Sequence, residues 1–287
     1  MAFRRRSRGF APALIAALLL VACRSSSPPG ASARMPLKVA AAADLAFAFR
    51  DLGARFEART GVPVVLSLGS TGLLARQIKE GAPFDVFAAA NVSFVEDVVR
   101  AGRCDGSTQA LYAYGRIVLW WSAKTQVMPP QTLRDLEDRR FTKIAIANPE
   151  HAPYGRAAEE ALRSAGVWEA VKPRLVFGEN VQQALEYART GNADVAFVAL
   201  SLATVTPGGW SLPVAPSLHK PIDQALVVCA QGARGAQGER AALARRFTAF
   251  VNSDEGHAVM RRFGFLLPGE TERPAAPPPP ARGEHRE

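Results

Sequence analysis

The chain has 287 residues, 48% of them hydrophobic and 21% charged, with a formal net charge of +9 at pH 7. This length and apolar content allow a folded core in one large or two small domains. Basic and acidic residues are interspersed without a basic stripe or zinc-ligand spacing, so we expect no nucleic-acid partner, although a modest positive field would attract anions.

The N-terminal segment combines arginines with an apolar run, Phe10 to Ala22, that is too short for a membrane span. The run ends in Leu20-Val21-Ala22-Cys23, which matches the lipobox of bacterial lipoproteins. We therefore predict a lipoprotein signal peptide over residues 1–22, a lipid on the Cys23 thiol and a flexible tether over residues 23–36. The protein would then be membrane-anchored at a periplasmic or extracytoplasmic face. The alternatives are an ordinary signal peptide followed by a chance Cys and an apolar run that is retained as a membrane anchor.

The first half of the chain alternates short apolar runs with amphipathic segments. A strand is predicted over residues 37–41, and apolar residues at helical spacing follow it from Leu45 to Phe56. Asp44 stands where it can cap or open this helix, and Gly61 ends it. The alternation continues with predicted strands over 63–68 and 85–88 and predicted helices over 73–79 and 92–101.

The second half of the chain follows the same alternation. Two apolar runs predict strands over 117–121 and 225–229. Between and after them we expect strands over 144–147, 174–177 and 194–199 and helices over 155–165, 181–190, 241–252 and 254–262. Strands that alternate with helices form parallel βαβ units, so the predicted fold class is α/β. Ligands of such sheets bind beyond the carboxyl ends of the strands.

Two predicted strand-to-helix loops are candidates for binding an anion. One is Gly69-Ser70-Thr71-Gly72, and the other runs from Asn148 to Gly155 and contains Pro153-Tyr154. A helix start presents unpaired backbone N–H groups and partial positive charge, which suits an anion. Because the two loops are far apart in the sequence, they indicate a cleft between two lobes.

Six short motifs follow one another in order along the chain. They are Ala40-Ala41-Ala42-Ala43-Asp44-Leu45, the stretch from Gly69 to Ile78, Gly81-Ala82-Pro83-Phe84-Asp85-Val86-Phe87, the stretch from Asn148 to Gly155, Gly178-Glu179-Asn180-Val181, and Arg262-Phe263-Gly264-Phe265. Each motif is weak alone, but the ordered set resembles the molybdate-binding, periplasmic component of bacterial ABC importers. The resemblance covers nearly all of residues 37–268.

The resemblance implies a type II periplasmic-binding-protein fold, with two α/β lobes joined by a hinge of two crossing strands. The hinge strands would lie around residues 112–121 and 222–229. Lobe 1 would comprise residues 37–113 and 222–268, and lobe 2 residues 114–221. The Pro-rich segment over 269–287 would be a disordered tail.

The resemblance also implies a function and its partners. The protein would be a monomeric solute-binding protein, and not an enzyme, that captures molybdate, and also tungstate, as an oxyanion. It would use no cofactor and would deliver the anion to the membrane subunits of an ABC permease. A receptor for another oxyanion, such as phosphate, sulfate or arsenate, is the alternative. An enzyme on the same fold is a more distant one, because no paired base and nucleophile is visible.

In the family that the chain resembles, hydroxyls and backbone N–H groups from both lobes hold the oxyanion without counter-charges. Carried over by motif, the first lobe would offer Asp44 and the Ser70-Thr71 loop. The second lobe would offer the backbone of Tyr154 and Val181, with Ala199 at a further position in the pocket. The site implied by the resemblance therefore comprises Asp44, Ser70, Thr71, Tyr154, Val181 and Ala199. A site built from donors matches a dianion with four acceptor oxygens.

Three of these positions depart from the family pattern, and one departure is conservative, since Thr71 stands where some relatives have Ser. Relatives often carry Ser, Thr or Asn around Asp44, and some carry Tyr at the Ala199 position. A carboxylate about 4 Å from an anion costs roughly 1 kcal/mol per charge pair in water and about 4 kcal/mol at an effective dielectric near 20. We therefore expect the Asp44 side chain to turn aside and cap its own helix. The alternative is that the ligand carries a proton, which Asp44 accepts.

The remaining reactive side chains give weaker indications. Cys104 and Cys229 would either pair in an oxidising compartment or remain free thiols. His219, His257 and His285 lie apart without metal-ligand spacing, so no metal site is expected. His151 is expected to stabilise its own loop rather than to touch a ligand.

Overall fold

The computed structural model describes residues 35–229 and 238–270. The predicted signal peptide, the lipidation site at Cys23, most of the tether and nearly all of the Pro-rich tail therefore lie outside the described residues. In the part of the chain that is described, none of the helices has the length and apolar character needed to cross a membrane.

The first of two sheets has the strand order β2-β1-β3-β10-β4. Its three parallel strands are β1 (Leu37–Ala42), β2 (Val64–Gly69) and β3 (Val86–Ala89). Two antiparallel strands, β10 (Ile222–Val228) and β4 (Asp105–Gly115), complete it. The apolar runs of β1 and β3 are buried on both faces, as expected for parallel strands covered by helices.

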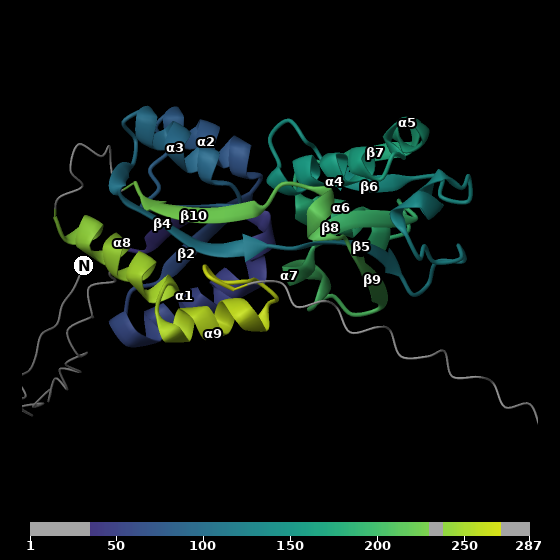
Figure 1. The fold of residues 1–287 in the computed structure, drawn as a ribbon. Helices are drawn as coiled ribbons and strands as arrows, with labels where there is room; N and C mark the ends of the chain where they lie inside the picture. Colours follow the sequence, from purple (N-terminus) through teal and green to yellow (C-terminus); the bar gives the residue numbers. More distant parts are fainter. Residues whose placement is uncertain (1–34, 230–237, 271–287) are drawn as a thin grey trace, which may run out of the picture. The chain divides into compact units, whose positions relative to one another are not determined.

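Helices cover both faces of this first sheet (Figure 1). Helices α2 (Thr71–Lys79) and α3 (Val92–Arg100) lie on one face, and α1 (Ala46–Thr60), α8 (Glu239–Val251) and α9 (Asp254–Arg262) lie on the other. Aromatic side chains join α1 to α8 within one helical layer, since Phe56 and Phe247 meet edge to face with ring centroids 5.2 Å apart. We call this sheet and its helices the first lobe.

The second sheet has the order β7-β6-β8-β5-β9. Strands β6 (Ile144–Ala147), β7 (Leu175–Gly178) and β8 (Val195–Ala199) are parallel, whereas β5 (Ile117–Ser122) and β9 (Gly209–Pro213) are antiparallel to their neighbours. Helices α4 (Pro153–Ser164) and α6 (Val181–Arg189) pack on β6 and β8. The shorter elements of this second lobe are η2 (Leu133–Glu137), α5 (Trp168–Val171), η3 (Lys172–Arg174), α7 (Leu200–Ala203) and η4 (Pro216–Leu218).

The chain passes between the two sheets twice. The first passage is at Arg116, between β4 and β5, which is two residues beyond the lobe boundary expected from the sequence. The second passage leads from η4 into β10, where Ile222 pairs with Gly115. The two passages are therefore neighbours.

Two covalent or ionic links hold the first lobe together. Cys104 and Cys229 form a disulfide across the paired strands β4 and β10, in which Asp105 faces Val228. This settles the choice that the sequence left open. The buried Asp85 carboxylate, just before β3, pairs through both oxygens with the guanidinium of Arg240 on α8.

Candidate functional site

The carboxyl ends of β1 and β2 bring the first three candidate residues to one edge of the first sheet. In the parallel pairing, Ala42 lies opposite Gly69. Asp44 follows β1 within a short 3-10 helix, η1 (Ala43–Leu45), and Ser70 and Thr71 follow β2 at the start of α2. Asp44, Ser70 and Thr71 are all buried. The strand register thus places two sequence-distant loops side by side.

The second sheet has an equivalent edge. Ala147 at the end of β6 lies opposite Gly178 at the end of β7, so the loops that lead to Tyr154 and Val181 leave the same edge. Ala199 ends the neighbouring strand β8 and lies opposite Ile117. The helices that begin after these strands, α6 and α7, both pack against η1 of the first lobe.

Asp44 lies at the centre of a buried hydrogen-bond network that joins the lobes. Its Oδ2 accepts from Nε2 of Gln224 on β10 at 2.6 Å and from the hydroxyl of Tyr154 on α4 at 3.0 Å. The Tyr112 hydroxyl on β4 donates to Oε1 of Gln224 at 2.8 Å, which fixes the orientation of that amide. Asp44 is only 2% exposed, and Tyr112, Tyr154 and Gln224 are equally enclosed.

The expectation that Asp44 caps its own helix is wrong. Asp44 lies inside η1, helix α1 begins after Leu45, and neither element has a side-chain cap hydrogen bond. The reason is that Gln224 and Tyr154 offer the carboxylate two donors in a buried place, which outweighs one backbone N–H. Burial raises the pKa of Asp44 from 3.8 to about 6, even though the hydrogen bonds from Gln224 and Tyr154 lower it.

The two tyrosines respond to the same environment. Burial raises the pKa of Tyr112 and of Tyr154 well above the usual value, and the neighbouring Asp44 charge raises both further. Both phenols therefore stay protonated and act as hydrogen-bond donors at physiological pH. At Tyr154 the side chain contacts Asp44, whereas only its backbone was expected at the site.

The Ser70 loop is joined to the second lobe through His151. The Ser70 hydroxyl donates to the His151 carbonyl at 2.7 Å, and Nδ1 of the ring lies 2.8 Å from the same hydroxyl oxygen. The Gly72 N–H also donates to that carbonyl, at 2.9 Å. His151 therefore links its loop to the other lobe, which goes beyond the local role expected for it. Thr71 Oγ1 accepts from the Ala90 N–H at 3.2 Å and keeps its own proton to donate.

Gly72 and Gly155 permit the close approaches on which this arrangement depends. An added Cβ on Gly72 would lie 2.8 Å from the His151 carbonyl oxygen, across the lobe boundary. An added Cβ on Gly155 would lie 2.1 Å from the Ala147 carbonyl oxygen, where α4 meets β6. In both cases the obstacle is backbone, which cannot rotate away. Glycine is required by space here, because neither residue has a positive φ.

The helix starts differ in how their N–H groups are used. Helices α2 and α4 begin at Ser70 and Ala152 without a side-chain cap. Helix α6 begins after Asn180, whose side chain accepts from the N–H groups of Gln182 and Gln183 and thus from positions beyond Val181. Uncapped helix N-termini present donors and positive potential to an anion.

Sequence reasoning missed two participants of this network, Gln224 and Ser201. Gln224 is 180 residues from Asp44 in the sequence, and the Ser201 hydroxyl donates to the Asp44 carbonyl at 2.8 Å across the lobes. The polar Gln224, directly before the apolar stretch Ala225 to Val228 of β10, was the available signal. Glu150 and Glu179, beside the candidate loops, are exposed and take no part in the network.

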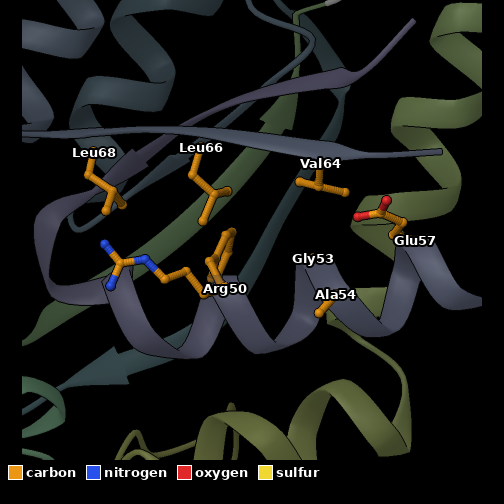
Figure 2. A pocket seen from close by; sticks show the side chains of 8 residues that line it. Arg50, Gly53, Ala54, Glu57, Val64, Leu66 and Leu68 are labelled. Carbon is orange, nitrogen blue, oxygen red and sulfur yellow. The ribbon is translucent and has the colours of Figure 1, made fainter. Parts of the chain in front are cut away.

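A surface hollow lies elsewhere on the first lobe, between α1 and β2 (Figure 2). Gly53 lets the helix approach the strand, because an added Cβ would lie 3.2 Å from Cβ of Val64. None of the six candidate residues lines this hollow. Its lining consists of Phe49, Arg50, Gly53, Ala54, Glu57, Val64, Leu66 and Leu68.

Comparisons with known proteins agree with the fold and the motifs. The family model described as bacterial extracellular solute-binding protein matches residues 37–266. The molybdate-binding protein ModA of Rhodobacter capsulatus is 36% identical over 229 residues, which cover 79% of this chain and 86% of the relative. ModA of Azotobacter vinelandii is 39% identical over 201 residues, covering 68% and 78%.

A solved structure of the Azotobacter vinelandii periplasmic molybdate-binding protein superposes with a TM-score of 0.73 at 31% identity, covering 81% of this chain and 99% of that one. The two-lobed α/β fold and the resemblance to molybdate-binding periplasmic proteins are therefore confirmed. The chain belongs to the bacterial extracellular solute-binding proteins.

Proposed function

We propose that this protein captures molybdate outside the cytoplasm and delivers it to the membrane subunits of an ABC transporter. Tungstate, which has the same charge and shape, would bind in the same way. The observation that carries the proposal is the convergence of the Ser70-Thr71 and Tyr154 loops from two lobes around one buried polar centre. Similarity to molybdate-binding relatives at 36–39% identity supports the choice of anion.

The chemistry of the site matches a tetrahedral dianion. The donors around η1 that no described hydrogen bond occupies are the Thr71 hydroxyl and backbone N–H groups at the starts of α2, α4 and α6, such as that of Val181. Such groups supply hydrogen bonds and partial positive charge without a counter-ion. Closing two lobes on the anion removes it from water, so each hydrogen bond to it gains strength.

Hydrogen phosphate is the second candidate ligand, and one observation favours it. The buried Asp44 carboxylate is an acceptor in a site otherwise made of donors, and a protonated oxyanion could donate to it. Molybdate carries no proton at neutral pH and offers acceptors alone. The two ligands thus make opposite demands on Asp44.

Calorimetric titration of the mature chain with molybdate, tungstate, sulfate and phosphate tests the proposal. We expect molybdate and tungstate to bind far more tightly than sulfate, whose shorter bonds leave a ring of donors sized for molybdate partly unused. Equal affinities for sulfate and molybdate would contradict the assignment, and a preference for phosphate would transfer it to the second candidate. Arg50→Ala, in the hollow of Figure 2, is the control and should leave all affinities unchanged.

We also propose that Cys23 carries the membrane anchor. The Leu20-Val21-Ala22-Cys23 motif supports cleavage before Cys23 and lipid attachment to its thiol. Cys23→Ser should abolish both lipid labelling and membrane association of the mature protein. An unmodified thiol at position 23 in the mature wild-type protein, seen by mass spectrometry, would overturn the anchor while leaving the ligand assignment intact.

A further inference from the structure

The two oxygens of the Asp44 carboxylate have different surroundings. Oδ2 accepts hydrogen bonds from both Gln224 and Tyr154. Oδ1 is buried and has no hydrogen-bond partner among the described residues. A buried polar atom without a partner costs free energy, and a charged one costs more. The network therefore satisfies one side of the carboxylate and leaves the other side open.

This asymmetry determines where a proton can reside. Oδ2 already accepts two hydrogen bonds, which leave no room for a covalently bound proton in the plane of the carboxylate. Oδ1 can take a proton without disturbing the bonds from Gln224 and Tyr154. Once protonated, Oδ1 becomes an O–H donor, which is the type of group that a fully deprotonated oxyanion needs.

We propose that Asp44 couples oxyanion binding to the uptake of one proton, which Oδ1 acquires from solvent and donates to an oxygen of the bound dianion. The inference rests on the proposed capture of a dianion such as molybdate. Carboxylate, solvent proton and dianion combine into a neutral carboxyl group hydrogen-bonded to the dianion, so the loaded site carries the ligand's two negative charges and none from Asp44. A repulsive contact becomes a hydrogen bond.

The groups that face Asp44 offer no positive charge that would keep the carboxylate ionised. The carboxylate accepts from the phenol of Tyr154 on α4 and the amide of Gln224 on β10, and the Asp44 backbone carbonyl accepts from the hydroxyl of Ser201 on α7. Behind Gln224 lies the phenol of Tyr112 on β4. Each of these groups is neutral at physiological pH.

Charged residues on the surrounding elements are engaged elsewhere or face away. Strand β2 and helix α7 contain none. The first ionic residue of α1, Arg50, lines the hollow of Figure 2, and Glu186 of α6 pairs with Arg189. Arg156 of α4 donates to backbone carbonyls of its own loop, and the His151 ring faces Ser70. Asp223, beside Gln224, points to the opposite face of the sheet because side chains alternate along a strand.

Burial has already moved the pKa of Asp44 to about 6, so near neutral pH the carboxylate is mostly ionised before ligand binds. A dianion beside it raises the pKa further. Uptake of one proton should therefore accompany binding above about pH 7, and affinity should fall about tenfold for each further pH unit. Below the pKa the carboxyl is already protonated, and the coupling should disappear.

The experiment is calorimetric titration of the mature chain with molybdate between about pH 5 and about pH 8, in buffers of different ionisation enthalpy. The slope of the observed binding enthalpy against the ionisation enthalpy of the buffer gives the number of protons taken up per anion bound. We expect close to one proton per anion at the upper pH and close to none at the lower pH. Asp44→Asn, whose amide is a permanent donor, should bind with no proton uptake and with an affinity independent of pH. Asp223→Asn, the matched control, should behave as wild type.

Each alternative result has a distinct meaning. Tight molybdate binding by wild type without proton uptake at any pH would overturn the coupling and leave the proposed function standing. Unchanged uptake in Asp44→Asn would assign the proton to another group and overturn the role of Asp44. Weaker binding of phosphate by Asp44→Asn, in a protein that prefers phosphate, would show that the proton arrives with the ligand. No molybdate binding at any pH would overturn the proposed function and this inference together. The wild-type proton count decides the coupling even if a variant fails to fold.

Discussion

The two lobes have equivalent sheets but contribute unlike halves to the site. Each sheet places three parallel strands beside two antiparallel ones and releases its loops at the carboxyl ends of the parallel strands. The first lobe supplies the buried acid, Asp44, fixed by Gln224. The second supplies Tyr154 and His151, which reach across to the first. The second lobe brings the Tyr154 hydroxyl as a donor to the Asp44 carboxylate, and the His151 carbonyl as an acceptor for the Ser70 hydroxyl and the Gly72 N–H of the first lobe.

The disulfide is one difference that can be broken. It belongs to the first lobe, and the second lobe has none among the residues that the structure describes. Replacing Cys104 and Cys229 by Ser should lower the free energy of unfolding by about 5 kcal/mol, since the closed loop spans 125 residues. Urea unfolding measures this loss, and wild type treated with dithiothreitol is the control. A loss below about 1 kcal/mol would show that the bond restrains little of the unfolded chain.

Removing the buried acid should stabilise the ligand-free protein. The pKa of Asp44 rises from 3.8 to about 6 on folding, so the folded state binds the proton more tightly than the unfolded state does. Proton binding therefore contributes its full free energy to stability below about pH 4. This contribution is lost as the pH rises through about 6. Asp44→Asn should therefore gain up to about 3 kcal/mol at pH 7. The gain should vanish near pH 4. Thermal unfolding across this pH range measures it, and an equal gain at both ends would contradict the electrostatic cause.

A methyl group at the lobe boundary should separate the two halves without unfolding either. In Gly72→Ala the new Cβ would lie 2.8 Å from the His151 carbonyl oxygen. Forcing the contact costs about 1–3 kcal/mol, so we expect molybdate affinity to fall by a factor between about 5 and about 150. Gly69→Ala is the matched control, because its Cβ would meet only the Leu74 side chain at 3.4 Å. Equal affinities of the two variants would disprove the role assigned to the boundary.

The hydroxyls of the first lobe should contribute a smaller amount. A hydrogen bond to a charged ligand contributes about 1.5–3 kcal/mol, so Thr71→Ala should weaken molybdate binding about tenfold or more. Ser70→Ala should weaken it by less, because the Ser70 hydroxyl would have to exchange its hydrogen bond to the His151 carbonyl for one to the anion. Thr71→Ser keeps the hydroxyl and should retain most of the affinity. Titration calorimetry provides the measurement. Wild-type affinity in both alanine variants would remove this loop from the site.

Most of the fold was predictable because its parallel strands and amphipathic helices carry strong local patterns. The strand predicted over 144–147 is β6 to the residue, and most of the other predicted elements end within one or two residues of those observed. The exceptions have physical causes. Strand β9 is a half-exposed edge containing Trp210 and Pro213, and the first part of β4 is polar, so neither shows a buried strand pattern.

The site was predictable in its loops but not in its network. Motifs located Asp44, Ser70 and Tyr154, since each follows a strand that a local pattern reveals. The hydrogen bond from Gln224 to Asp44 depends on the register of an antiparallel strand from the far end of the chain. Helix capping is a local preference, so it was the natural expectation for Asp44, and long-range donors overrode it.

The discontinuous first sheet has a consequence for the order of folding. Strands β5 to β9 lie within one continuous stretch, residues 117–213, so the second lobe has its whole sheet as soon as that stretch is available. The first sheet must wait for β10, which lies between β3 and β4 and follows the entire second lobe in the sequence. During synthesis the N-terminal half therefore remains incomplete for longest. Until β10 arrives, Cys104 has no partner and Asp44 lacks Gln224, so the candidate site forms only when nearly the whole chain is present.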